Sequence, residues 1–474
     1  MTLTFFSLLF TATTGTLFFI MKKSCRYALL AIAGIVYVSI LRLFAGVAIT
    51  TVVLAAWIIG VILDFTKRKN HLKMAKFVFV VSVSAIAVML VVSKLGMAFI
   101  TTHQPDSRLV YYLMPLGFSF YMFRVISYFA DCYTGKIIAE HNLFKLMLYL
   151  AWFPAFVSGP IERYERFSRQ IENLKKTRLF DSERWNRVLA YLLIGFFYKV
   201  VIADRLGIIV DHIFGQYNSL NSLWLILGSL FYTLQVYFDF AGYSYAAIGF
   251  SLIFGIDLIE NFRIPYFSEN ITDFWRRWHI SLSQWLRDYI YIPLGGNRKG
   301  IIRKQINTMI VFLVCGLWHG GDLSFIVWGA LHGLYSILCN LLKANGKNKL
   351  ISGWTGRIMT FILVSFAWIF FRADSLSIAC CYIGRILTSG FSSTAVTAAD
   401  LGLDWWEGAI LLISIGVTGI VEWHSYKADC SVPNQVRKMN VMLQYVSAFL
   451  IFVVIVIFGV YGPAAGSHLI YMDF

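Results

Sequence analysis

Long apolar stretches separated by short polar breaks run along the whole chain. An α-helix needs about 20 mostly apolar residues to cross a bilayer, and most of the stretches approach that length. The pattern predicts spanning helices at 2–20, 28–46, 48–65, 74–95, 109–129, 143–160, 188–210, 222–250, 306–318, 324–342, 355–371, 406–422 and 441–462. Two of these, 143–160 and 306–318, are short or interrupted and are candidates for re-entrant segments. We expect an all-α, multi-pass helical bundle with about eleven crossings plus re-entrant or interfacial helices.

The composition excludes an ordinary soluble protein. Hydrophobic residues make up 58% of the 474 residues, charged residues make up 14%, and the mean hydropathy is +0.69. Soluble chains carry about 25% charged residues. The sequence shows no internal repeat and no low-complexity tract, so we expect a single polytopic membrane domain over 1–474.

The net charge of +16 indicates an orientation in the membrane and not a nucleic-acid partner. Lys and Arg gather in the short breaks, at 22–26, 67–73, 163–187, 298–304 and 343–357. This is the distribution of the positive-inside rule, and it places 163–187 and 257–304 inside. Met1 and Phe474 would then lie outside. The stretch 2–20 has no basic region before it and no cleavage site, so it reads as a first spanning helix and not as a removable signal.

Neither the cysteines nor the known motifs indicate a metal or a soluble hydrolase. The seven cysteines form no Cys-x-x-Cys pair, and most lie in or beside apolar stretches. Neither a disulfide framework nor a zinc site is therefore expected. The chain has no His-Glu-x-x-His sequence and no Gly-x-Ser-x-Gly elbow of a soluble fold.

The segment Asp273-Phe-Trp-Arg-Arg-Trp-His279-Ile-Ser-Leu-Ser carries the first candidate histidine. We expect one helix over 272–289, with His279, Arg276 and Arg287 on one face and tryptophans on the other. Such a helix would lie in the inner interface with its histidine face toward a cavity. An ordinary interfacial anchor helix fits the same pattern.

His319 is the second candidate, forty residues after His279. A short apolar helix over 306–318, about 20 Å long, would carry it into a hydrocarbon core of about 30 Å. Gly320 and Gly321 then break the helix, and the freed backbone groups must line a cavity. Burial there favours the neutral imidazole, which can accept a proton. A structural histidine hydrogen-bonded between helices fits equally well.

Other polar residues in apolar surroundings suggest supporting roles. Asp239 is either a functional polar contact within the membrane or a partner for an intramembrane Arg or Tyr. Asp322 is a candidate for orienting the His319 imidazole, and it fits a simple loop residue as well. His332 reads as a packed polar residue. The basic turn Pro293-Leu-Gly-Gly-Asn-Arg298-Lys299-Gly300 offers backbone N–H groups and cations for cofactor phosphates, although a plain cytoplasmic turn has the same composition.

Six motifs occur in an order that resembles a known family. They are Pro154-x5-Gly159-Pro160-Ile161-Glu-Arg163-Tyr, Tyr237-Phe-Asp239-Phe-Ala-Gly-Tyr-Ser, Asn261-Phe-x-x-Pro265-Tyr, Asp273-Phe-Trp-Arg-Arg-Trp-His279-Ile-Ser-Leu-Ser, Pro293-Leu-Gly-Gly-Asn-Arg and Leu317-Trp-His319-Gly. Together they resemble the membrane-bound O-acyltransferase family. The likeness is to its bacterial branch with the alginate O-acetyltransferase membrane subunit, to which the teichoic-acid D-alanylation membrane protein is close. It spans about residues 105–345 strongly and the flanking helices loosely.

This resemblance implies a fold, a reaction and partners. The fold would be a ring of transmembrane helices with re-entrant helices and a cytosolic funnel leading to the histidine. His319 would be the family's invariant histidine and His279 its second functional position. Members take an acyl group from a cytosolic thioester and deliver it outward across the bacterial plasma membrane, often to an SGNH hydrolase-like partner that acts on a polysaccharide. Acetyl-CoA would be the acyl-donor substrate, with no bound cofactor.

The C-terminal sequence Leu469-Ile-Tyr471-Met-Asp-Phe474 resembles the aromatic tail of this branch. It differs from that tail at Met472 and Asp473. Tyr471 is accordingly a candidate for carrying the acyl group or docking the partner protein, and a frayed terminus is the alternative.

We therefore expect O-acylation, most simply O-acetylation, of an exported or cell-surface polysaccharide. His319 would act as general base, and His279 would position the thioester or stabilise the developing oxyanion. The cofactor's phosphates would meet the basic side chains Arg276, Arg287, Arg298 and Lys299. Two other enzyme functions stay open, namely D-alanyl transfer to teichoic acid from a carrier protein and acylation of a lipid acceptor. A non-enzymatic transporter or flippase also fits buried ionisable residues and broken helices, although no repeat supports it.

Overall fold

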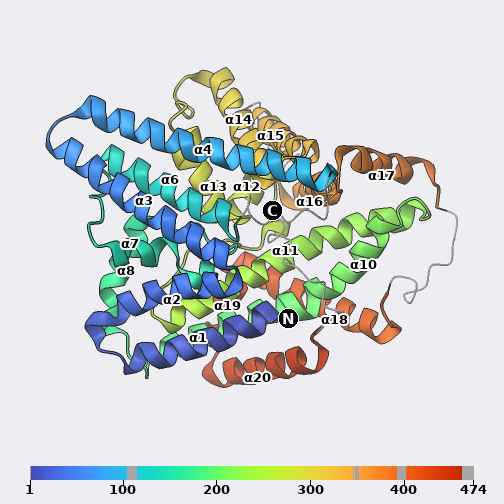
Figure 1. Ribbon diagram of the computed structural model, residues 1–474. Coiled ribbons are helices and arrows are strands. Elements are labelled where there is room, and N and C mark those ends of the chain that lie inside the picture. The colour runs from blue at the N-terminus through green and yellow to red at the C-terminus, as the bar shows by residue number, and fades with distance from the viewer. Residues whose placement is uncertain (1, 104–114, 345, 347–351, 392–401, 462–474) are drawn as a thin grey trace. The chain divides into compact units, whose positions relative to one another are not determined.

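The computed structural model describes residues 2–103, 115–344, 346, 352–391 and 402–461 (Figure 1). The described residues are about 80% helical and include no strand. They divide into two compact units, one formed by 2–188 with 247–259 and the other by 189–246 with 260–474. The long helix α11 (Ser222–Ile253) and the helix α9 (Ser182–Phe196) each begin in one unit and end in the other. The prediction of a single domain stays a prediction.

The first unit contains the N-terminal helices. These are α1 (Thr2–Ile20), α2 (Arg26–Leu41), α3 (Leu43–Arg68), α4 (Leu72–His103), α6 (Phe118–Thr134), α7 (Leu143–Leu150) and α8 (Tyr164–Asn173). Helices α3 and α4 lie side by side, joined by a short turn (Figure 1). The predicted stretches at the N-terminus therefore correspond to helices, with ends that differ by several residues.

The second unit contains the helices of the C-terminal half. These are α10 (Asp204–Gly215), α12 (Ile271–Arg277), α13 (Ile280–Leu286), α14 (Gly300–His319), α15 (Leu323–Ala344), α16 (Gly353–Arg372), α17 (Leu376–Thr388), α18 (Trp405–Lys427), α19 (Val432–Val436) and α20 (Val441–Phe458). A π-helical segment, Phe197–Ala203, joins α9 to α10. Helices α14 and α15 pack against each other as an antiparallel pair (Figure 1).

Within the described ranges, nine helices are long and apolar enough to cross a membrane. Shorter apolar helices occur at Phe6–Ile20, Leu143–Ala155 and Leu376–Thr388. The chain is thus a multi-pass helical protein, as the apolar pattern predicted. The short apolar helix at Leu376–Thr388 was not predicted from that pattern.

Two predicted helices differ from the structure. The stretch 306–318 belongs to the 20-residue helix α14, because the polar first turns from Gly300 are also helical. Helix α14 is therefore about 30 Å long, whereas the helix predicted over 306–318 would be about 20 Å long. The predicted single helix over 272–289 is wrong: it breaks between α12 and α13 at Trp278 and His279. Trp278 is extended and only 1% exposed, so the break turns both side chains into the protein.

The motif from Pro154 to Arg163 follows the eight-residue helix α7 and is largely non-helical. Arg124 of α6 holds it in place: Nη2 donates to the Ala155 carbonyl at 2.8 Å, and Nη1 donates to the Tyr149 carbonyl at 3.3 Å. Such donors are needed because backbone groups freed from a helix must find partners when they are buried. This agrees with the prediction that 143–160 is short and interrupted.

Candidate active site

The turn between α14 and α15 places His319. His319 is the last residue of α14, and Gly320 continues in an extended conformation. A side chain at Gly320 is excluded, because a Cβ there would lie 2.3 Å from the Phe325 ring. Gly316 also permits close packing, since a Cβ there would lie 2.4 Å from the Phe325 carbonyl oxygen. The glycines let the start of α15 pack directly against the end of α14.

His319 is enclosed by aromatic rings and is only 2% exposed. Its ring centroid lies 4.6 Å from Trp318, 5.1 Å from Trp328 and 5.2 Å from Phe371. The contact with Trp328 is edge to face, with an interplanar angle of 89°. These contacts fix the plane of the imidazole in apolar surroundings.

His279 lies at the start of α13 in a left-handed conformation, with φ of +42°. A non-glycine residue rarely adopts this conformation, which is typical of functional sites. Asn261 supports the turn, because its carbonyl oxygen accepts from the Ile280 backbone N–H at 2.9 Å and its side chain accepts from that of Ser281 at 3.2 Å. These two hydrogen bonds give a structural reason for Asn261 in the Asn261-Phe motif.

The side chain of His279 is completely buried. Its ring packs edge to face on Phe240 at 4.7 Å and lies 6.3 Å from Trp318. Burial lowers the pKa of His279 to about 3, so the ring is neutral at physiological pH. Trp318 contacts the rings of both histidines, so the structure brings His279 and His319 to one aromatic cluster.

His332 belongs to the same cluster and is completely buried. Trp275 Nε1 donates to His332 Nδ1 at 3.2 Å. The His332 ring lies 5.0 Å from Trp328, which is itself in contact with His319. The spacing of Trp328 and His332, four residues apart on one helix face, is the signal that would have linked them.

Both acidic candidates have polar partners in the structure. Lys199 Nζ lies 2.6 Å from Asp239 Oδ1 and 2.8 Å from Asp204 Oδ1, so a lysine is one partner of Asp239. Lys199 and Asp204 were not identified from the sequence. Asp322 Oδ1 accepts from the Ser324 backbone N–H at 2.7 Å, an interaction at the start of α15.

The basic candidates lie on the surface, whereas both histidines are buried. Arg276, Arg287, Arg298 and Lys299 are all exposed, and Arg287 pairs with Asp288 at 2.8 Å. The glycine-rich turn that carries two of them is held by Asn307, whose side chain donates to the Gly296 carbonyl at 3.0 Å. Tyr471 lies outside the described residues.

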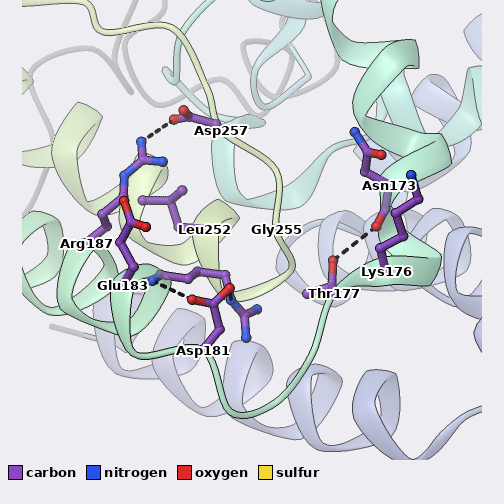
Figure 2. Close-up of a pocket in the computed structure, with 10 residues that line it drawn as sticks. Asn173, Lys176, Thr177, Asp181, Glu183, Arg187, Leu252, Gly255 and Asp257 are labelled. Atoms are coloured by element: carbon purple, nitrogen blue, oxygen red, sulfur yellow. Dashed lines mark hydrogen bonds and ion pairs between the residues drawn. The ribbon is translucent and has the colours of Figure 1, made fainter.

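A polar cavity of about 350 Å³ lies between α8, the loop after it, α9 and the segment after α11 (Figure 2). Arg187 Nη2 lies 2.9 Å from Asp257 Oδ1 at one side of it. Arg184 Nη1 donates to the carbonyl of Ile253, the last residue of α11, at 2.6 Å. Its charged groups thus bind one another and a helix end, and no candidate residue from the sequence lines it. In the described part of the chain, no three His, Cys, Asp or Glu side chains lie close enough to hold a metal ion.

Comparison with known proteins identifies the family. Residues 134–384, more than half of the chain, match the membrane-bound O-acyltransferase family model. The chain is 42% identical to a probable alginate O-acetylase AlgI of Pseudomonas fluorescens over 287 residues, which are 60% of this chain and 55% of that protein.

A second probable alginate O-acetylase AlgI, from Pseudomonas aeruginosa, is 38% identical over 387 residues, 77% of this chain and 70% of that protein. The teichoic acid D-alanyltransferase of Bacillus subtilis is 32% identical over 286 residues, 57% of this chain and 70% of that protein. The match spans little more than half the length of several of the alginate O-acetylases. With its membrane-spanning helices and these matches, the chain is an integral membrane protein that belongs to the membrane-bound O-acyltransferase family.

Proposed function

We propose that the protein is an O-acyltransferase that moves an acyl group, most simply acetyl, from a cytosolic thioester to hydroxyls of an exported or cell-surface polysaccharide. One observation carries this proposal. Two buried histidines from separate motifs contact the same indole, Trp318, beside a broken helix. Buried imidazoles in a desolvated site suit the proton transfer that acyl transfer requires.

In the proposed reaction, His319 takes the proton of the acceptor hydroxyl as its oxygen attacks the thioester carbonyl carbon. The C–O bond forms, the C–S bond breaks, and the proton passes from the imidazolium to the departing thiolate. The net change is a thioester and a hydroxyl giving an ester and a thiol. His279, held rigidly by its strained backbone, would position the thioester or stabilise the charge that develops on its oxygen.

The donor and partners remain part of the proposal. Acetyl-CoA is the proposed donor substrate, and the exposed side chains Arg276, Arg287, Arg298 and Lys299 would bind its phosphates from the cytosolic side. An extracytoplasmic SGNH-like protein would complete the transfer to the polysaccharide. Tyr471 would carry the acyl group or dock that partner. The proposed location is the bacterial plasma membrane.

One alternative has specific support. The 32% identity to a teichoic acid D-alanyltransferase favours D-alanyl transfer from a carrier protein as the second candidate. Transport without ester formation has no comparable support, because the sequence shows no repeat and the relatives are acyl-transfer enzymes by their printed names.

The experiment is a deletion of the gene, complemented by the wild-type chain. The surface and secreted polysaccharides are treated with mild alkali, and the released acid is identified. Acetate that depends on the chain supports O-acetylation, and D-alanine supports the second candidate. Ester content unchanged by the deletion would overturn both and leave transport as the better interpretation.

A further inference from the structure

Two ring N–H groups beside His319 are buried without a hydrogen-bond acceptor among the described residues. They are Trp328 Nε1 and His332 Nε2, in side chains that are both 0% exposed. The two rings lie 5.0 Å apart on one face of α15. Indole N–H groups are donors only, so Trp328 can be satisfied only by an acceptor that comes from elsewhere.

The proton of His332 can be assigned to Nε2. Trp275 Nε1 donates to His332 Nδ1 at 3.2 Å, so the Nδ1 lone pair acts as the acceptor. A ring nitrogen that accepts a hydrogen bond carries no proton, which excludes the imidazolium form. In the neutral ring the single proton must then lie on Nε2. His332 therefore offers a second N–H donor next to that of Trp328.

The position of this donor pair points to a ligand. Buried donors without acceptors are rare and costly, because each has lost its hydrogen bonds to water. Trp328 packs edge to face on the His319 ring at 5.1 Å, and the His332 ring lies 5.0 Å from Trp328. The Trp368 ring stacks on Trp328 at 5.5 Å and closes the other side. Both donors therefore belong to the aromatic cluster that surrounds His319.

We propose that Trp328 Nε1–H and His332 Nε2–H bind the carbonyl oxygen of the acyl group, an inference that rests on the proposed acyl transfer. When the acceptor hydroxyl adds to the thioester carbon, the C=O electron pair moves onto this oxygen and makes it an oxyanion. The charge returns to the carbonyl when the C–S bond breaks and the thiolate takes the proton from His319. Fixed N–H donors in a water-poor site stabilise this charge more than the uncharged ground state.

A pair of substitutions at one position separates this role from packing. In His332→Asn, the side-chain oxygen can replace Nδ1 as the acceptor for Trp275, but nothing reaches the Nε2 position. In His332→Gln, the longer amide places an N–H donor at the Nε2 position and loses the Nδ1 acceptor. A purely structural role, resting on the observed Trp275 hydrogen bond, predicts that Asn is the better substitute. The oxyanion role predicts that Gln is.

The expected result is a loss of kcat of about 10²–10³-fold for His332→Asn and for Trp328→Phe, with little change in KM. His332→Gln should retain at least ten times the kcat of His332→Asn. Tyr335→Phe, on the same helix with its ring 6.0 Å from His332, is the control expected to leave kcat unchanged. Equal kcat values for the Asn and Gln variants, or a better Asn variant, would overturn the proposal.

Binding of two unreactive donor analogues provides a test without turnover. One is S-acetonyl-CoA, which has a ketone carbonyl and no cleavable thioester, and the other is S-propyl-CoA, which has no carbonyl. The wild type should bind the ketone at least tenfold more tightly, and His332→Asn should lose that preference. Equal affinity of the wild type for the two overturns the oxyanion site alone. Absence of binding by either rejects CoA as the donor, and with it both this inference and that part of the proposed function.

Discussion

Replacing Lys199 with methionine is expected to destabilise the protein strongly. Its ammonium group lies 2.6 Å from Asp239 Oδ1 and 2.8 Å from Asp204 Oδ1, and the side chains of the three residues are 17%, 4% and 6% exposed, respectively. At an effective dielectric constant of about 20, each contact is worth about 6 kcal/mol before the cost of desolvating the ions. Without the lysine, the carboxylates of Asp204 and Asp239 lose the ammonium group that both of them contact among packed helices.

The net loss should be about 3–5 kcal/mol, the cost of removing one partner from a buried ion pair. In detergent-purified protein this should lower the apparent Tm, followed by tryptophan fluorescence, by about 3–5 °C. The triple variant Lys199→Met, Asp204→Asn, Asp239→Asn removes all three charges and should recover much of that loss. An apparent Tm of Lys199→Met equal to that of the wild type would refute the reasoning, as would a triple variant with a lower apparent Tm than the single variant.

Two further predictions concern the histidines and their supports. Gly320→Ala should reduce acyl transfer at least tenfold, because the new Cβ collides with Phe325, which packs on Phe371 beside His319. The measurement is the ester content of the polysaccharide. Gly384→Ala is the control, because a Cβ at Gly384 meets open space. His279→Gln should make stability less sensitive to acid. The folded pKa of His279 is about 3, against 6.5 unperturbed, so only the unfolded chain gains its proton as the pH falls below 6.5, and the wild type loses stability. Burial of the neutral His279 ring therefore costs the wild type about 2 kcal/mol of folding stability at pH 5. If the unfolding midpoint fell equally in the wild type and in His279→Gln between pH 7.5 and pH 5, the prediction would be wrong.

The sequence predicted the helices well because spanning segments must be long and apolar, a property of composition alone. It also located the break after His319, since Gly320 and Gly321 follow an apolar stretch. The start of α14 at Gly300 was not predicted, because a hydropathy pattern marks only the apolar part of a helix. The break at Trp278 was missed for a different reason. That segment has helical periodicity and no Gly or Pro, and its left-handed residue is a histidine.

The pairing of charged and polar residues was harder to predict than the helices. Lys199 lies within a predicted span, and its partner Asp239 is forty residues away on another helix. Nothing local connects them, because the contact exists only once the helices have packed. The surroundings of His332 were equally hard to predict, because its ring contacts Trp275 on α12 as well as Trp328 on its own helix. The order of the sequence motifs, by contrast, was sufficient to select His279 and His319 as candidate site residues.

The most direct test of the account compares His319→Ala with His424→Ala. His424 is an exposed histidine near the end of α18, so this control makes the same chemical change away from the aromatic cluster. Alkali-labile esters on the surface and secreted polysaccharide are measured at matched membrane levels of each protein. The account predicts that His319→Ala abolishes the chain-dependent ester while His424→Ala keeps it. Wild-type ester levels in a well-expressed His319→Ala strain would contradict the assignment of His319 as the general base.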